Sequence, residues 1–433
     1  MKIEVTINGK EVDVKVNSEL KVSNDELYSV KVIDDINDVV QDIKVKQVVC
    51  NAYHTFIIDK DNRLLAAGLN DKGQLGLGDI NNRCSFTYTG IDGVQQVVCG
   101  YKHTFIIDKD NRLLAAGLND KGQLGLGDIN NRCLFTYTGY DNVKQISCGD
   151  DHTFIIDKDG KLLATGNNGY GQLGIGNNDN RKSFTDTGYD NVKLIKCGND
   201  HTFIINKDNK LLCTGYNYYG QLGLGDNKNR NTFTYTSYDD IQQVVCGDNH
   251  TFIINKDGDL FATGRNEYGH LGLGDNDNRN TFIDTGIKDV KQVICGGFHT
   301  FIIDKNNKLL TTGFNIYGQL GLGDNKNRNT FTYTSYDDIQ QVVCGWAHTF
   351  IIDKDSNLLS TGYNNNGQLG LEDNNNRNTF IDINIKNVKQ VFCGDYHTFI
   401  IDKDGKLLAT GNNGYGQLGI GNNDNENIFT YIS

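Results

Sequence analysis

The chain has 433 residues, of which 37% are hydrophobic and 22% charged, and its formal net charge is −12. This composition is typical of a folded globular protein, and the lack of any run of about 18 apolar residues excludes a membrane-spanning helix. The acidic balance also argues against nucleic acid as a partner, because binding to phosphates needs clustered Lys and Arg.

The N-terminal segment, residues 1–44, differs in character from the rest of the chain. Ile3–Ile7 and Glu11–Val16 flank an Asn-Gly pair, which predicts a β-hairpin with a two-residue turn. Asp25–Ile36 (DELYSVKVIDDI) is similar to the outer strand and link of later units, so it could add a strand that closes a ring. The first residues lack the apolar stretch of a signal peptide, so we expect an intracellular, cytoplasmic location, with the nucleus as the alternative.

From residue 45 onward the sequence is an eightfold repeat. One cysteine and one histidine each recur at a constant interval of 49 residues. The positions are Cys50, Cys99, Cys148, Cys197, Cys246, Cys295, Cys344 and Cys393, and His54, His103, His152, His201, His250, His299, His348 and His397. A period of 40 to 50 residues with strand-like content is typical of a β-propeller. We therefore expect one closed body over residues 45–433 rather than several domains.

Each unit contains four short strands and no helical period. In the unit that begins at Val143, apolar strands are expected in VKQISCG, HTFIID, KLLATG and SFTDT, and we name them A to D. K-D-G joins B to C, and a long Gly/Asn loop joins C to D. This pattern predicts an all-β fold, a β-propeller of four-stranded antiparallel blades built from eight 49-residue repeats.

The repeated C-G-x-x-H motif brings a thiol and an imidazole together, as in Cys99, Gly100 and His103 or Cys148, Gly149 and His152. Copies spread around a ring cannot converge on one ion, so we expect structural roles: the cysteine as a small buried hydrophobe, the histidine bonded to backbone at the A–B turn. We expect no metal, no cofactor and no catalytic residue.

Two further motifs resemble functional sites without the required context. The D-K-D-G sequence at Asp157–Gly160 lacks the ligand series and the final Glu of a calcium loop, and it suits a tight turn. Gly169–Gly174 matches G-x-G-x-x-G, but an Asn-rich loop follows it where a dinucleotide site needs a helix. One Arg per unit is expected to brace the C–D loop.

The paired motifs G-x-N-x-x-G-Q-L-G-x-G and C-G-x-x-H-T resemble those of the regulator of chromosome condensation family, and Gly264–Gly274 (GRNEYGHLGLG) is similar to its consensus. The resemblance implies a propeller of about 50-residue repeats, usually with seven blades. We favour eight, since every unit has four strands, with seven as the alternative. The founding member is a nucleotide exchange factor for the Ran GTPase that also binds chromatin, but the insertion associated with its exchange activity has no counterpart here. The family's photoreceptor uses clustered tryptophans, whereas this chain has only Trp346.

Because the units are near-copies, the positions at which they differ are informative. Strand alternation places the A–B turns and C–D loops on one face, and those segments vary in sequence while the B–C turns hardly vary. Aromatic anchors beside charged residues are typical of interfaces. We therefore expect this face to bind a protein through Tyr218, Tyr219, Phe298, Ile316, Tyr317, Trp346, Tyr363, Tyr396, Asp150 and Asp151.

Three functions remain open at this point. The first is a non-enzymatic, monomeric protein-interaction scaffold that uses the variable face. The second, implied by the resemblance alone, is a guanine nucleotide exchange factor for a Ran-like or other small GTPase. The third is a multivalent propeller with equivalent ligand pockets between its blades. We do not expect hydrolytic or redox catalysis, because no unique nucleophile, acid or metal cluster is present.

Overall fold

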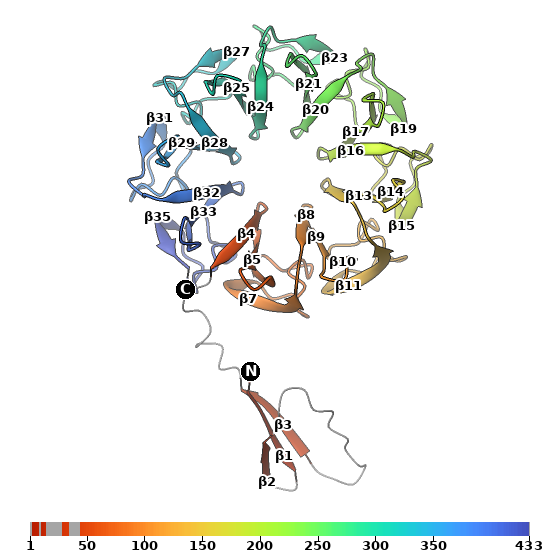
Figure 1. Ribbon diagram of the computed structural model, residues 1–433, viewed down its shortest axis with the longest axis vertical. Helices are drawn as coiled ribbons and strands as arrows, with labels where there is room; N and C mark the ends of the chain where they lie inside the picture. Colours follow the sequence, from red (N-terminus) through yellow and green to blue (C-terminus); the bar gives the residue numbers. More distant parts are fainter. Residues whose placement is uncertain (1, 8–9, 14–27, 34–43, 433) are drawn as a thin grey trace. The chain divides into compact units, whose positions relative to one another are not determined.

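The computed structural model describes residues 2–7, 10–13, 28–33 and 44–432, and it divides into two compact units, Met1–Ile43 and Lys44–Ile432. Figure 1 shows the second unit as a ring of blades. Within the described residues all regular structure is β, and no helix there is long and apolar enough to cross a membrane.

The N-terminal unit is a three-stranded antiparallel sheet in the order β2-β1-β3. Its strands are β1 (Lys2–Ile7), β2 (Lys10–Asp13) and β3 (Tyr28–Ile33). Ile7 pairs with Lys10, so the connection between β1 and β2 spans two residues, which themselves lie outside the described part. In the segment for which a ring-closing role is predicted, β3 pairs with β1, and residues 25–27 and 34–36 lie outside the description.

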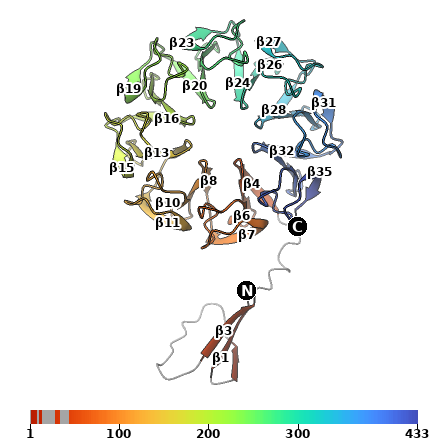
Figure 2. The same ribbon diagram turned by 180° about the vertical axis from the view of Figure 1, so that it is seen from behind.

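The propeller has eight four-stranded antiparallel blades, each built from one repeat, which confirms the predicted fold class and blade number. The A strands surround the axis and the D strands form the rim (Figures 1 and 2). The A strands are β4 (Val45–Cys50), β8 (Gln96–Cys99), β12 (Gln145–Cys148), β16 (Val192–Cys197), β20 (Ile241–Cys246), β24 (Val290–Cys295), β28 (Ile339–Cys344) and β32 (Val388–Cys393). The B strands are β5 (His54–Asp59), β9 (His103–Ile107), β13 (His152–Ile156), β17 (His201–Asn206), β21 (His250–Asn255), β25 (His299–Asp304), β29 (His348–Asp353) and β33 (His397–Asp402).

The outer half of each blade follows the same order. The C strands are β6 (Arg63–Gly68), β10 (Arg112–Gly117), β14 (Leu162–Gly166), β18 (Leu211–Gly215), β22 (Leu260–Gly264), β26 (Leu309–Gly313), β30 (Leu358–Gly362) and β34 (Leu407–Gly411). The D strands are β7 (Arg83–Asp92), β11 (Arg132–Asp141), β15 (Arg181–Asp186), β19 (Arg230–Tyr235), β23 (Arg279–Asp284), β27 (Arg328–Tyr333), β31 (Arg377–Asp382) and β35 (Glu426–Tyr431).

The hydrophobic core lies between neighbouring blades. At the junction of the third and fourth blades, Phe154 and Ile156 of β13 pack against Ile195 of β16 and Phe233 of β19. The rings of Phe154 and Phe233 meet edge to face with centroids 6.1 Å apart. Both faces of the B and C strands are covered in this way, which explains why HTFII and LLATG lack the polar alternation of a half-exposed strand.

The C–D loop of each blade packs onto strand D of the next blade. A Cβ at Gly171 would lie 2.5 Å from the carbonyl oxygen of Arg230, so only glycine fits at this approach. An isolated bridge between Ile175 and Thr232 then joins the two blades. The same bridge recurs at every junction and closes the ring between Ile420 of the last blade and Ser85 of the first.

Side chains in the B–C turn and the C–D loop have the structural roles predicted from the sequence. The carboxylate of Asp157 accepts hydrogen bonds from the backbone N–H groups of Asp159 and Lys161, both 2.9 Å long, which is the bonding of a tight turn. Arg230 braces its C–D loop by donating to Asp226 at 2.8 Å and to the carbonyl of Lys228 at 2.7 Å.

Candidate functional site

The A–B turns and C–D loops lie on one face of the propeller and touch each other. The backbone N–H of Asn167, at the start of a C–D loop, donates to the carbonyl of Asp151 in the A–B turn at 2.8 Å. The eight A–B turns also converge on the ring axis, where they line one cavity of about 450 Å³. This face therefore combines a central cavity with a surrounding surface of loops.

The conserved spacing of C-G-x-x-H is explained by packing of the histidine ring on the glycine. A Cβ added at Gly149 would overlap the Cε1 atom of His152 and lie 2.7 Å from the carbonyl oxygen of Gly198. The backbone N–H of Gly149 also donates to the carbonyl of His152 at 2.9 Å. Glycine is thus required here by the contact, because any side chain would displace the histidine.

The histidine side chain bonds the next blade, where we had expected a bond to backbone. Nε2 of His103 lies 3.0 Å from Oγ1 of Thr153, and that hydroxyl donates to the carbonyl of Gln123 at 3.0 Å. Since the hydroxyl proton is already used, Nε2 must carry the ring proton and donate it. The last blade bonds the first in the same way, with 3.3 Å between His397 and Thr55.

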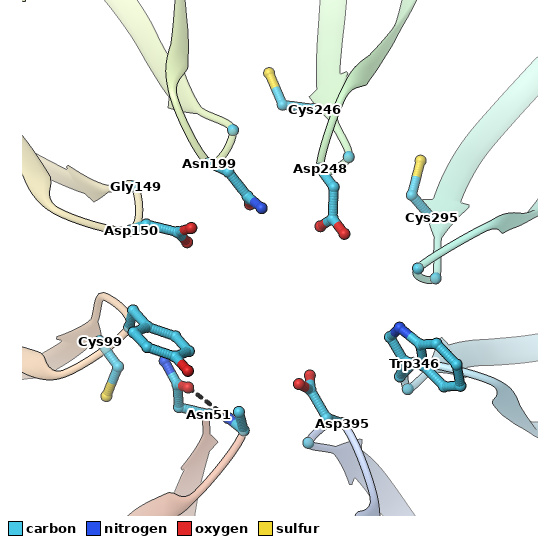
Figure 3. Close-up of a pocket in the computed structure, with 18 of the residues that line it drawn as sticks. Asn51, Cys99, Gly149, Asp150, Asn199, Cys246, Asp248, Cys295, Trp346 and Asp395 are labelled. Atoms are coloured by element: carbon cyan, nitrogen blue, oxygen red, sulfur yellow. Dashed lines mark hydrogen bonds between the residues drawn. The ribbon is translucent and has the colours of Figure 1, made fainter. Parts of the chain in front are cut away.

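Burial keeps these histidines neutral and these cysteines in the unreactive thiol form. Burial, with a smaller contribution from a neighbouring histidine, lowers the pKa of His103 to about 3, so the ring stays neutral. Burial also raises the pKa of the Cys99 and Cys197 thiols to about 12, so neither forms the reactive thiolate. The sulfur atoms of Cys99, Cys246 and Cys295 point away from the axis (Figure 3).

Two blades depart from this arrangement. The first has Asn51 where the other seven units have glycine, and both ring nitrogens of His54 are buried without a hydrogen-bond partner. In the fifth blade His270 replaces the loop glutamine, and its ring lies 4.8 Å from that of His250, centroid to centroid. In the described structure the hydroxyl of the following Thr300 bonds the His270 carbonyl at 2.9 Å.

Three carboxylates converge in the central cavity. Asp150, Asp248 and Asp395 each follow the C-G pair of their unit, and their carboxylates point toward the middle of the cavity together with the amide of Asn199 (Figure 3). Within residues 44–432 none of the three carboxylates forms an ion pair or a hydrogen bond. Trp346 lies on the cavity wall across from Asp150.

The carboxylates perturb each other as expected for partly buried like charges. Burial and the neighbouring charges of Asp200, Asp151, Asp248 and Asp395 raise the pKa of Asp150 to about 7. Burial and the charge of Asp248 raise the pKa of Asp395 to about 6. Burial also raises the pKa of Asp248 itself. The cavity is thus a place where a positive charge would be stabilised.

The second variable residue of each A–B turn lies away from the axis, against the C–D loops. There the aromatic side chains of blades four to eight form two neighbouring groups, which together we call the aromatic band. Its members are Tyr216, Tyr218, Tyr219, Tyr268, Phe298, Phe314, Tyr317, Trp346, Tyr363 and Tyr396. Tyr218 is its most exposed member at 65%, and Ile316, next to Tyr317 in the sequence, is 49% exposed.

Arg265 bridges the one gap in the band. Its guanidinium lies 5.1 Å from the ring centroid of Tyr219 and 5.2 Å from that of Phe298, within the range of cation–π contacts. It also donates to Glu267 at 2.6 Å. Arg265 is therefore held in place by both the aromatic rings and the carboxylate.

The structure brings most of the predicted binding residues together but separates one pair. Tyr219, Phe298, Tyr317, Trp346, Tyr363 and Tyr396 are half-buried members of the band, Tyr218 is an exposed member, and the exposed Ile316 adjoins it. Asp150 faces the axis, whereas Asp151 lies at the loops and accepts a hydrogen bond from Gln123 at 3.3 Å. The two aspartates belong to different surfaces.

Sequence reasoning missed Asp395 and Asn199 as cavity residues, and Arg265 as a bridge. The signal was available for the first two, since both occupy the position directly after C-G, as Asp150 does. The two variable positions of each A–B turn were considered together, so the difference between the position that faces the axis and the one that faces the loops was not recognised. Nothing in the sequence placed Arg265 between rings contributed by two other blades.

The protein is therefore a repeat propeller of a particular class. Its eight blades carry C-G-x-x-H turns on one face, and the G-Q-L-G loop of each blade packs on the next blade. The Regulator of chromosome condensation (RCC1) repeat matches residues 45–74, 94–123, 339–368 and 388–417 in one form and 61–107, 110–156 and 355–401 in another, and the RCC1-like domain matches residues 136–334. The chain belongs to the RCC1 family. No curated protein matches this sequence.

Solved structures share the fold at low sequence identity. Human WBSCR16 is 22% identical with a TM-score of 0.62, covering 79% of this chain and 98% of its own. Prp20p of Saccharomyces cerevisiae, described with its binding to Gsp1p and histones, is 19% identical with a TM-score of 0.57, covering 74% and 86%. Yeast Prp20 bound to Kap60 is 17% identical with a TM-score of 0.59, covering 98% and 91%.

Proposed function

We propose that this protein is a non-enzymatic interaction scaffold that binds a protein partner through the face bearing the A–B turns and C–D loops. The aromatic band is the observation that carries this proposal. Repeat units that are otherwise near-copies differ at these positions, and the resulting rings pack together in blade four and from blade five to blade eight, with Arg265 between the two groups. Large, half-buried aromatic side chains of this kind dominate the binding energy of many interfaces.

The packing of the band supports a preformed surface. Trp346 meets Tyr396 at 5.6 Å and Phe298 at 6.4 Å between centroids, so its rotamer is held before any partner arrives. Tyr218 and Tyr219 meet edge to face at 5.1 Å. Side chains held in this way lose little conformational freedom on binding, which favours affinity.

The test is a triple substitution of Trp346, Tyr218 and Tyr219 by Ala. Immobilised wild-type protein is expected to capture a defined partner from cell extract, and the triple variant is expected to lose that partner. The matched control replaces three tyrosines on the outer D strands, Tyr235, Tyr333 and Tyr431, which are 58%, 59% and 61% exposed. Equal capture by wild type and the band variant, with both folded, would disprove the proposal.

A second candidate function is guanine nucleotide exchange on a small GTPase, and the fold shared with Prp20p supports it. Such a factor opens the nucleotide site of its GTPase and needs no catalytic triad of its own. The experiment is release of a fluorescent guanine nucleotide from a panel of small GTPases, Ran-like ones included. Catalytic acceleration for one of them would establish exchange activity, and none for any of them would leave the scaffold function alone.

A further inference from the structure

The central cavity carries acidic side chains and has no cation in its lining; Arg265, outside the lining, only partly offsets the charge of Asp248. Its lining contains three carboxylates, those of Asp150, Asp248 and Asp395, and includes no Lys, Arg or His. The cations nearest on this face are already paired, since Lys102 lies 2.9 Å from Asp71 and Arg265 lies 2.6 Å from Glu267. A positively charged group of a partner would therefore complement the charge of the cavity.

The walls of the cavity suit an alkylammonium or guanidinium group. Trp346 and Tyr101 contribute aromatic surface, and indole is the best cation–π acceptor among the side chains. Asn199 adds an amide oxygen as a hydrogen-bond acceptor. The volume of about 450 Å³ falls within the range of about 300–1,000 Å³ found for ligand-binding clefts.

The cavity is continuous with the aromatic band, because Trp346 belongs to both. Its ring lines the cavity and also packs on Phe298 and Tyr396, which lie at the loops. The backbone N–H of Gly297 donates to the carbonyl of Trp346 at 3.2 Å, and glycine at this position leaves room for the indole. A segment of a partner protein that lies on the aromatic band could therefore place one of its side chains at the opening of the cavity.

We propose that the protein partner docks a basic segment on the aromatic band and inserts one lysine or arginine side chain into the central cavity, between Asp150, Asp248 and Asp395. This inference rests on the proposed scaffold function and specifies the chemistry of its partner. The carboxylates supply charge complementarity, and the rings of Trp346 and Tyr101 cover the aliphatic part of the inserted side chain. A bound metal ion is a different occupant, and no group of three ligating side chains in the described residues is close enough to hold one.

The single tryptophan makes occupancy directly measurable. Because Trp346 is the only Trp of the chain, its emission reports on the place where the cavity meets the aromatic band. Octalysine and octaarginine are the probes, with octaserine and octaglutamate as neutral and acidic controls. A saturable change of emission at one peptide per protein is expected for the basic probes only. Binding of eight equivalent peptides, or no saturable binding, would overturn the proposal.

Paired variants separate the cavity from general attraction by an acidic protein. D150N/D248N/D395N removes three charges from the A–B turns of the third, fifth and eighth blades. The control D159N/D257N/D404N removes three charges from the exposed B–C turns of the same blades. We expect the cavity variant to weaken binding at least 30-fold and the control less than 3-fold. Equal losses in the two variants would show that net charge alone attracts the probes.

Two further outcomes have defined meanings. Titration with CaCl₂ that changes Trp346 emission in the wild type and displaces the peptide would assign the cavity to a metal ion and overturn the proposal. The partner captured from extract separates this inference from the proposed function. If that partner is lost with the band substitutions but retained by D150N/D248N/D395N, the scaffold function stands and the basic-segment inference fails.

Discussion

Replacing Asp150 with asparagine is expected to stabilise the propeller above neutral pH. The carboxylate faces the axis, half-buried, with no cation or donor to compensate its charge in the described structure. Burial and the surrounding aspartates raise its pKa from 3.8 to about 7. Asparagine has nearly the same shape and carries no charge, so the substitution removes the unfavourable charge and leaves the packing unchanged.

The magnitude follows from the pKa. A native-state pKa of about 7 against 3.8 when unfolded corresponds to about 4 kcal/mol once the group is fully ionised, and water in the cavity reduces this to about 2–4 kcal/mol. Because the raised pKa means that the native state binds the proton more tightly, the wild type is favoured at low pH. It loses this stability as the pH rises from about 4 to about 7.

The assay is urea unfolding of wild type and D150N at pH 5, 6.5 and 8. The free energy of unfolding of D150N should exceed that of wild type at pH 8 by about 2–4 kcal/mol, and the difference should shrink steadily toward pH 5. Asp159→Asn, at an exposed turn, serves as the control and should show little difference at any pH. A D150N protein no more stable than wild type at pH 8 would refute the reasoning.

Three further substitutions test the blade junctions and loops by thermal or urea unfolding. Gly149→Ala should destabilise by about 2–3 kcal/mol, because the new Cβ overlaps the ring of His152. Thr153→Val should cost about 2 kcal/mol, since Nε2 of His103 loses its buried acceptor. Glu372→Gly should stabilise by about 1 kcal/mol, because Glu372 has a φ of 65° that glycine adopts without strain.

Each of these has a matched comparison in the same chain. Gly169→Ala, where a Cβ meets nothing closer than 3.5 Å, should change stability little, so an equal loss at both glycines would contradict the packing argument. Thr185→Val removes an exposed hydroxyl and should be nearly neutral. Gly323→Glu reproduces the Glu372 substitution in the preceding blade and should destabilise by about 1 kcal/mol; a neutral result would contradict the backbone argument.

The fold could be predicted from the sequence because its information is local and repeated. Short strands, mostly of five or six residues, together with turn residues and a constant period of 49 residues define a blade without reference to other blades. The count of eight complete units then predicted eight blades, although propellers of the family usually have seven. The closing contact, Ile420 with Ser85, repeats the bridge found between every other pair of blades.

The site was only partly predictable, because it depends on the directions in which side chains point, and a sequence pattern does not give these directions. Asp150 and Asp151 are adjacent, yet one faces the axis and the other the loops. Choosing between them requires the geometry of the A–B turn within a closed ring. The threonine partner of a repeat histidine such as His103 was missed for a related reason, since the threonine that accepts its proton lies 50 residues away in the next blade.

Because the closing junction uses the same β-bridge as the other seven, no blade is structurally first or last. A chain opened at a different D–A link, with its present ends joined, should reach the same ring. An in-frame duplication of one unit would likewise insert a blade without requiring a new kind of contact, and residues 54–84 and 103–133 are identical in sequence. Each inserted blade would widen the axial opening, so blade number sets how large a group the centre of the ring can admit.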